Sequence, residues 1–242
     1  MLIIPAMDLI GGECVRLRKG NFKEKTRYDC DPLSQAKNFE AAGAKWLHVV
    51  DLDGAKTGRP QNLPVILNLA QKTNLKIQLG GGLRDISAVE NVLEAGINRA
   101  VIGSLAVKNP SLVSGLSKTF GPGRLVVALD VFSAPGRFSV AKEGWQKDSH
   151  LSLDAMIPFF LKAGIRHFLV TDISRDGMLL GPNAELYKSV LKNFPGISLQ
   201  ASGGVASGGD IKDLEKTGVS AAIVGKAIYE GRLPLKGLFR AG

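Results

Sequence analysis

The sequence predicts a single (β/α)8 barrel of the α/β class, extending over residues 1–242. Short apolar segments, typical of strands covered on both faces, alternate with helical segments from end to end. Eight strands alternating with eight helices favour a closed parallel barrel over an open doubly wound sheet. The chain is close to the roughly 250 residues usual for such a barrel, and no linker or low-complexity segment divides it.

The expected elements follow one another in regular order. Strands are expected at residues 2–5, 46–51, 76–79, 99–102, 125–129, 167–171, 198–201 and 221–224. Helices are expected near residues 32–42, 63–72, 86–95, 110–120, 153–163, 183–193 and 209–217, with a short last helix after Pro234. Asp85 and Asn109 stand directly before expected helices, where their side chains can accept hydrogen bonds from the first free N–H groups.

An internal repeat divides the barrel into halves of about residues 1–121 and 122–242. Asp8 and Asp130 are 122 positions apart, after similar apolar runs. The same or nearly the same offset, 121 to 123 positions, relates further pairs: Gly81 and Gly203, Gly82 and Gly204, Gly96 and Gly218, Gly103 and Gly225, Asp51 and Asp172, and Gly54 and Gly177. Several matches in one order predict two half-barrels related by a twofold axis. The weaker alternative is that all βα units resemble one another.

Composition excludes several classes of protein. The net charge of +9 comes from basic residues scattered over the expected helices, which favours an anionic small substrate over nucleic acid. No run of about 18 apolar residues is present to span a membrane, and no signal peptide is expected. Cys14 and Cys30 are too few for a disulfide framework and lack metal-site spacing, so we expect a cytoplasmic protein.

Two aspartates are candidate proton-transfer groups. We expect Asp8 to close the first strand and Asp130 the fifth, on opposite sides of the mouth formed by the C-terminal strand ends, where such barrels carry their sites. A carboxylate on each side suits a general acid and a general base. The structural alternative is that each caps a helix or pairs with a nearby arginine. It is the better explanation for one aspartate alone, and the weaker one for two at equivalent positions.

Glycine-rich loops follow four of the strands. Glycine lets the backbone approach a ligand closely, and a following helix presents free N–H groups to an anion. The loops after strands seven and eight commonly bind phosphate in these barrels, and here the arrangement is duplicated after strands three and four. A substrate with two phosphates is therefore expected, bound by Gly81, Gly82, Gly103 and Ser104 at one end and by Ser202, Gly203, Gly204, Gly225 and Lys226 at the other.

The segment after strand six supplies further candidates. Thr171 can hydrogen-bond a reacting hydroxyl and Asp176 adds a third carboxylate, although an ordinary Asp–Gly turn also explains this loop. Its counterpart at residues 51–54 is shorter and is expected only to support the site. Trp145, in the long connection after Asp130, either packs locally or stacks on a planar ligand.

Arg16 is expected to meet a phosphate or an aromatic ring, whereas Arg18 is expected in solvent. His48 and His167 lie in expected strands and are assigned structural roles, and His150 is expected in a loop. No metal-ligand cluster and no activated serine or cysteine nucleophile is recognisable.

Taken together, these residues resemble the phosphoribosylformimino-aminoimidazole-carboxamide ribotide isomerases of histidine biosynthesis. The resemblance covers essentially the whole chain. It rests on residues 4–9, 50–56, 80–84, 128–131, 144–146 and 171–183. It implies a substrate with two phosphoribosyl groups and an Amadori rearrangement of an aminoaldose to an aminoketose, with no metal or organic cofactor.

The resemblance also implies residue roles. Asp8 would be the base that takes the C2 proton, and the acid that protonates the ribose ring oxygen would be Asp176 or Asp130, with Asp176 favoured. Thr171 would hold a ribose hydroxyl, and Trp145 would stack on the imidazole carboxamide when its loop closes. Met178, the extra residues 132–136, and Lys226 in place of a common arginine depart from the family pattern.

Other functions fit the same scaffold. The cyclase subunit of imidazole glycerol phosphate synthase has similar paired aspartates and phosphate loops, but it typically begins Cys–Leu–Asp where this chain has residues 6–8, Ala–Met–Asp. A bifunctional enzyme that also isomerises phosphoribosylanthranilate shares the scaffold. A non-catalytic bisphosphate-binding barrel is disfavoured because three carboxylates near phosphates would weaken binding. We expect a monomer with no nucleic-acid or membrane partner.

Overall fold

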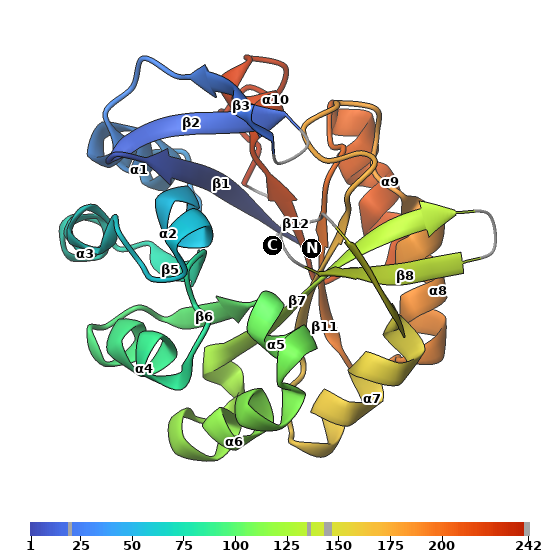
Figure 1. Ribbon diagram of the computed structural model, residues 1–242. Coiled ribbons are helices and arrows are strands. Elements are labelled where there is room, and N and C mark those ends of the chain that lie inside the picture. The colour runs from blue at the N-terminus through green and yellow to red at the C-terminus, as the bar shows by residue number, and fades with distance from the viewer. Residues whose placement is uncertain (19–20, 135–136, 143–146, 240–242) are drawn as a thin grey trace.

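The computed structural model describes residues 1–18, 21–134, 137–142 and 147–239, and within them eight parallel strands close into a barrel (Figure 1). The ring strands are β1 (Leu2–Ile10), β4 (Trp46–Asp51), β5 (Lys76–Gly80), β6 (Arg99–Ile102), β7 (Leu125–Ala134), β10 (His167–Asp172), β11 (Ser198–Ser202) and β12 (Ala221–Val224). β12 pairs in parallel with β1, which closes the ring. The predicted fold class is confirmed.

The helices surround the ring (Figure 1). Those that match the sequence prediction are α1 (Pro32–Ala41), α3 (Leu63–Lys72), α4 (Ile86–Glu94), α6 (Pro110–Phe120), α7 (Leu153–Lys162), α8 (Ala184–Asn193) and α9 (Gly208–Thr217). The side chains of Asp85 and Asn109 accept hydrogen bonds from Ala88 N and Leu112 N, so both predicted helix caps are confirmed.

Four short helical elements were not predicted: α2 (Leu52–Thr57), α5 (Ser104–Lys108), the 3-10 turn η1 (Pro122–Arg124) and α10 (Lys226–Tyr229). The predicted helix after Pro234 is wrong. Residues 236–239 form turns, with Gly237 at a φ of +84°, a left-handed backbone that does not continue a right-handed helix.

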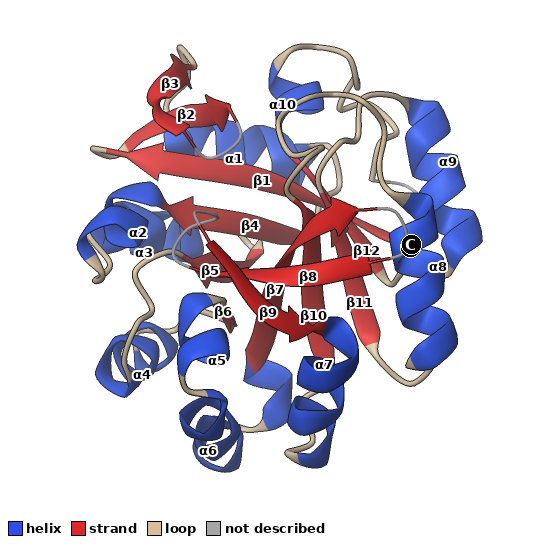
Figure 2. Cartoon of the chain, turned by 45° about the vertical axis from the view of Figure 1, so that its right-hand side comes forward, coloured by secondary structure: helices blue, strands red, loops and turns tan. Residues whose placement is uncertain are grey.

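Two antiparallel hairpins extend from the ring (Figure 2). β1 continues past the barrel and pairs with β2 (Glu13–Arg18), which pairs with β3 (Asn21–Arg27). β7 likewise pairs with β8 (Arg137–Lys142), which pairs with β9 (Lys147–Ser152). Asp8 and Asp130 therefore lie inside strands, and the prediction that each closes its strand is wrong. The strands run on because a hairpin partner takes up their hydrogen bonds beyond the ring.

Most of the apolar core in the described part of the chain forms two layers, and a small third cluster lies under the β2 hairpin. The larger lies between strands and helices and contains large buried side chains such as Phe39, Phe160 and Tyr187. The smaller fills the inside of the barrel, with Ile4, Val126 and other inward-facing residues. This filled interior leaves space for a ligand at the C-terminal ends of the strands.

Corresponding loops of the two halves are held by corresponding carboxylates. Asp51, fully buried, accepts hydrogen bonds from Gly54 N at 2.8 Å and from the side-chain nitrogen of Asn62 at 2.7 Å. Asp172, also fully buried, accepts one from the side-chain nitrogen of Asn183 at 2.6 Å. Each aspartate thus fixes a loop against which the glycine-rich segment of the next strand packs.

Close packing explains the glycines of these segments. Gly81 has a φ of +95°, and a Cβ built there would lie 2.1 Å from the carbonyl oxygen of Asp51. Gly204 has a φ of +93°, and its Cβ would lie 2.2 Å from the carbonyl oxygen of Gly181. Both positions exclude any side chain, whatever ligand the loops hold.

We expect Gly81→Ala to lower the free energy of unfolding by about 3 kcal/mol, from the left-handed backbone and from the displaced Asp51 loop together. Gly96→Ala is the matched control, because Gly96 has a φ of +100° with nothing within 4 Å of a built Cβ. It should cost only about 1 kcal/mol. Urea unfolding of both variants measures the difference, and equal losses would show that the contact with Asp51 is not what requires glycine.

Candidate active site

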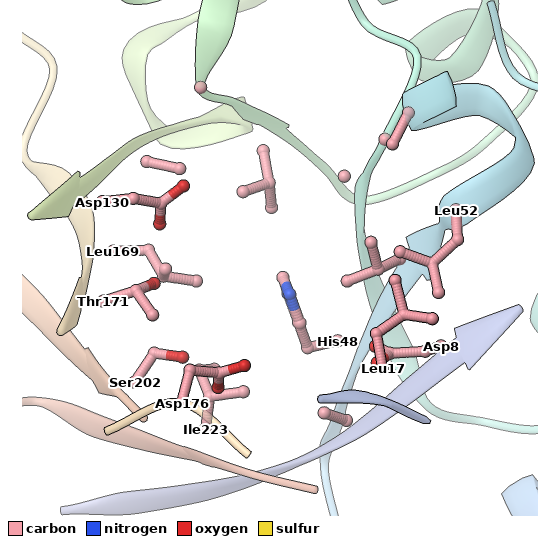
Figure 3. Close-up of a pocket in the computed structure, with 18 of the residues that line it drawn as sticks. Asp8, Leu17, His48, Leu52, Asp130, Leu169, Thr171, Asp176, Ser202 and Ile223 are labelled. Carbon is pink, nitrogen blue, oxygen red and sulfur yellow. The ribbon is translucent and has the colours of Figure 1, made fainter. Parts of the chain in front are cut away.

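A cavity of about 310 Å³ opens where the ring strands end, and most predicted site residues line it (Figure 3). Residues from both halves contribute: Asp8, Arg16, Gly81, Gly82, Gly103, Ser104, Asp130, Thr171, Asp176 and Ser202. A smaller adjoining cavity of about 20 Å³ is lined by the other predicted residues, Gly203, Gly204, Gly225 and Lys226, together with Arg16 and Asp176. Trp145 lies outside the described residues.

Arg16 joins two of the three carboxylates. It lies on β2, which pairs with β1 so that Val15 stands opposite Asp8. Its Nη1 donates to Asp8 Oδ2 at 3.1 Å, and its Nη2 donates to both carboxylate oxygens of Asp176, at 2.7 and 2.6 Å. The arginine partner considered as the alternative for Asp8 is therefore present, and it lies inside the cavity.

This ion pair is largely withdrawn from solvent. The side chains of Arg16 and Asp176 are 17% and 14% exposed and that of Asp8 is 9% exposed. Arg16 Nε is buried and has no hydrogen-bond partner among the described residues. The expected contact of Arg16 with a phosphate or an aromatic ring stays a prediction.

Burial sets the protonation behaviour of Asp8. Loss of hydration raises the pKa of this carboxyl above its ordinary value and outweighs the opposing effect of the Arg16 charge; the charge of Asp176 raises the pKa further. Burial by itself lowers the pKa of Arg16, but the charges of Asp176 and Asp8 together outweigh burial and raise it, so Arg16 stays cationic. A carboxylate with a raised pKa binds a proton more readily, which suits a general base.

Asp130 and Thr171 lie on another wall of the cavity, across from Asp8 (Figure 3). They are direct neighbours in the parallel pairing of β7 with β10. Asp176 follows β10, and its backbone N–H donates to Asp172 O at 3.1 Å. Loop geometry therefore links Asp176 to the fully buried Asp172, which itself does not line either cavity.

Basic side chains stand beside both predicted phosphate loops. Arg84, which the site prediction omitted, lines the large cavity near Gly81 and donates to Ala55 O. The resemblance at residues 80–84 was the signal that could have identified it. Lys226 lines the small cavity and donates to Gly177 O at 3.0 Å. A cation beside a glycine loop fits an anionic ligand at each end.

His48, expected to have only a structural role, lines the large cavity. Its ring reaches into the cavity (Figure 3), and Nδ1 lies 3.0 Å from the side-chain nitrogen of Gln78. Burial and the Arg16 charge lower the pKa of His48 to about 4, so the ring is neutral near pH 7. His167, by contrast, is absent from the cavity lining and contacts Arg99, in keeping with its predicted structural role.

Phe22 was missed as well. This β3 side chain is 40% exposed and lines the cavity from the hairpin.

Within the described residues, no group of three or more His, Cys, Asp or Glu side chains is arranged to hold a metal ion. No helix in the described part of the chain is long and apolar enough to cross a membrane.

Comparison with known proteins gives a consistent result. Residues 2–234 match the family described as "Histidine biosynthesis protein". A protein of Elusimicrobium minutum is 46% identical over 236 residues, covering 98% of both chains. One of Photobacterium profundum is 45% identical over 240 residues (99% of this chain, 98% of the other), and one of Francisella philomiragia is 44% identical over 236 residues (98% of each). All three are named 1-(5-phosphoribosyl)-5-((5-phosphoribosylamino)methylideneamino) imidazole-4-carboxamide isomerase.

Removal of the arginine charge should raise the pKa of Asp8 further. In Arg16→Gln the carboxyl loses a positive neighbour, so Asp8 should hold its proton to a higher pH than in the wild type. A titration followed by the carbon-13 NMR signal of the Asp8 carboxyl measures the shift. Arg27→Gln, on the same hairpin but paired with the exposed Glu13, is the control and should leave Asp8 unchanged. An Asp8 pKa that is unchanged or lower in Arg16→Gln would contradict the assigned ion pair.

Proposed function

The chain belongs to the histidine biosynthesis protein family, and from this membership we propose that it is an isomerase acting on an imidazole carboxamide ribotide with a second phosphoribosyl group. The phosphoribosyl end of the phosphoribosylformimino-aminoimidazole-carboxamide ribotide becomes a phosphoribulosyl group in L-histidine biosynthesis. The reaction is an Amadori rearrangement, an aldose–ketose isomerisation that needs no external oxidant or reductant.

One observation carries the proposal: Arg16 holds Asp8 and Asp176 together in a cavity lined by residues of two glycine-rich loops. Each loop has a cation beside it, Arg84 at one and Lys226 at the other. Two anion sites with carboxylates between them suit a long substrate that has a phosphate at each end and a proton-transfer step in the middle.

The chemistry proposed for the carboxylates is the one that the family resemblance implies. The acid protonates the ribose ring oxygen, so that the C1–oxygen bond breaks and a protonated Schiff base forms between C1 and the amine nitrogen. Asp8 then removes the C2 proton, which leaves an enolamine. Loss of the C2 hydroxyl proton and protonation of C1 give the aminoketose, with atoms and charge balanced.

Asp176 is assigned as the acid in preference to Asp130. It shares Arg16 with Asp8 and so stands at the same reacting centre, whereas Asp130 lies beside Thr171. Thr171 holds a ribose hydroxyl and Asp130 positions or assists. Stacking of Trp145 on the imidazole carboxamide is part of the proposal on the strength of the resemblance alone.

The assigned residues that line the two cavities all belong to the single barrel, and a monomeric enzyme stays a prediction. Its two cysteines are unpaired, which suits a reducing cytoplasm.

We expect the purified protein to form the aminoketose without ammonia. Asp8→Asn should lower kcat by about a thousandfold or more, because proton transfer is lost, while the dissociation constant of the substrate changes little. Asp213→Asn, an exposed carboxylate paired with Lys216, is the control and should retain full turnover. Near-native turnover in Asp8→Asn would show that the base is misassigned.

The same assay separates the alternative functions. Product formed only from the phosphoribulosyl compound plus ammonia would favour the cyclase. Turnover of phosphoribosylanthranilate as well would indicate the bifunctional enzyme. Binding without turnover of any of these substrates would leave a non-catalytic bisphosphate-binding barrel.

A further inference from the structure

Two glutamines meet at the centre of the barrel. Gln78 on β5 and Gln200 on β11 are 122 positions apart, the offset that relates the two halves. The side-chain nitrogen of Gln78 donates to the side-chain oxygen of Gln200 at 2.8 Å, and the reverse bond is 3.1 Å. Gln78 is fully buried and Gln200 is 2% exposed. A buried amide pair costs stability unless its bonds are made, so each amide fixes the orientation of the other.

The pair also fixes a third side chain. The side-chain nitrogen of Gln78 lies 3.0 Å from His48 Nδ1. Its second N–H, the one not donated to Gln200, points to this ring nitrogen. With an amide nitrogen as its neighbour, Nδ1 is the acceptor. A neutral imidazole that accepts at Nδ1 bears its hydrogen on Nε2.

The second ring nitrogen of His48 is available to a ligand. No residue in the described ranges forms a hydrogen bond with Nε2, and the ring lines the large cavity. In the pairing of β1 with β4, His48 stands opposite Ala6 and Val50 opposite Asp8, so His48 lies one inward-facing layer deeper than Asp8. A neutral N–H donor thus stands at the floor of the cavity below the assigned base.

We propose that Gln78, oriented by Gln200, is a positioning residue that holds His48 so that its Nε2–H donates a hydrogen bond to a substrate oxygen at the cavity floor. This inference rests on the proposed isomerase function. The half-barrel counterpart of His48 is Leu169, 121 positions later, which also lines the cavity but has no hydrogen-bonding group. The donor therefore acts on one end of the substrate only, and it distinguishes the reacting sugar from the other.

The hydrogen position can be measured without substrate. The chain has three histidines, so nitrogen-15 NMR can assign the tautomer of His48. We expect Nε2–H in the wild type, and a mixture of tautomers in the double variant Gln78→Leu with Gln200→Leu, where no amide faces Nδ1. Turning both amides over together would preserve their mutual bonds but place the hydrogen on Nδ1. That tautomer in the wild type would overturn the inference.

Kinetics test the role in the reaction. The double leucine variant removes both partners of the buried pair, so the fold should persist; its melting temperature checks this. We expect kcat to fall about tenfold in it, with a smaller change in KM and a smaller loss in Gln200→Leu alone, where Gln78 still reaches His48. Wild-type kcat in a folded double variant would overturn the inference.

A comparison of two replacements of His48 tests whether the donor group itself is needed. An amide can accept from Gln78 and still donate to the substrate, so His48→Gln should retain more turnover than His48→Leu. Equal losses would contradict the donor role. If the wild type fails to isomerise the ribotide, the proposed function is wrong. If the wild type is active and the Gln78 and His48 variants are equally active, only this inference is wrong.

Discussion

The ion pair of Arg16 with Asp8 and Asp176 is the interaction on which the rest of the site depends. Asp8 comes from the first half of the chain and Asp176 from the second, and the arginine holds both in one cavity. Two carboxylates close together in a buried place repel each other, which raises the pKa of at least one of them. The guanidinium offsets that repulsion, yet burial still keeps the pKa of Asp8 high. Burial of these charged groups lowers the stability of the fold. The fully buried Asp51 and Asp172 help to hold the surrounding loops in place.

The two halves share a scaffold but differ in the groups they place in the cavity. Asp51 with Asn62 and Asp172 with Asn183 hold equivalent loops, and Gln78 meets Gln200 between the halves. At other equivalent positions the residues differ: His48 corresponds to Leu169, and Val50 to Thr171. The loops and contacts that the two halves share suit a substrate with a phosphate at each end. The differing parts suit a reaction at one end only.

Periodicity predicted the ring of strands and most helices, because long buried segments have strong patterns. Helices of four to six residues, such as α2 and α10, are too short for that pattern. Asp8, Asp130 and Thr171 were recognised from the repeat and their places near strand ends. The bridge that Arg16 forms between Asp8 and Asp176 was not recognised, because it depends on how the β2 hairpin folds back over the barrel. The place of His48 in the cavity was not predicted, because its direction depends on strand register, which the sequence of one strand does not reveal.

The central claim is that Asp176 protonates the ribose ring oxygen and that Asp8 then removes the C2 proton. The primary isotope effect on turnover of substrate deuterated at C2 tests it most directly, measured in the wild type, Asp176→Asn and Asp130→Asn. If Asp176 opens the ribose ring, its replacement makes ring opening the slow step, so the isotope effect should fall toward one in Asp176→Asn and stay at the wild-type value in Asp130→Asn. An isotope effect that falls in Asp130→Asn and is unchanged in Asp176→Asn would contradict the account.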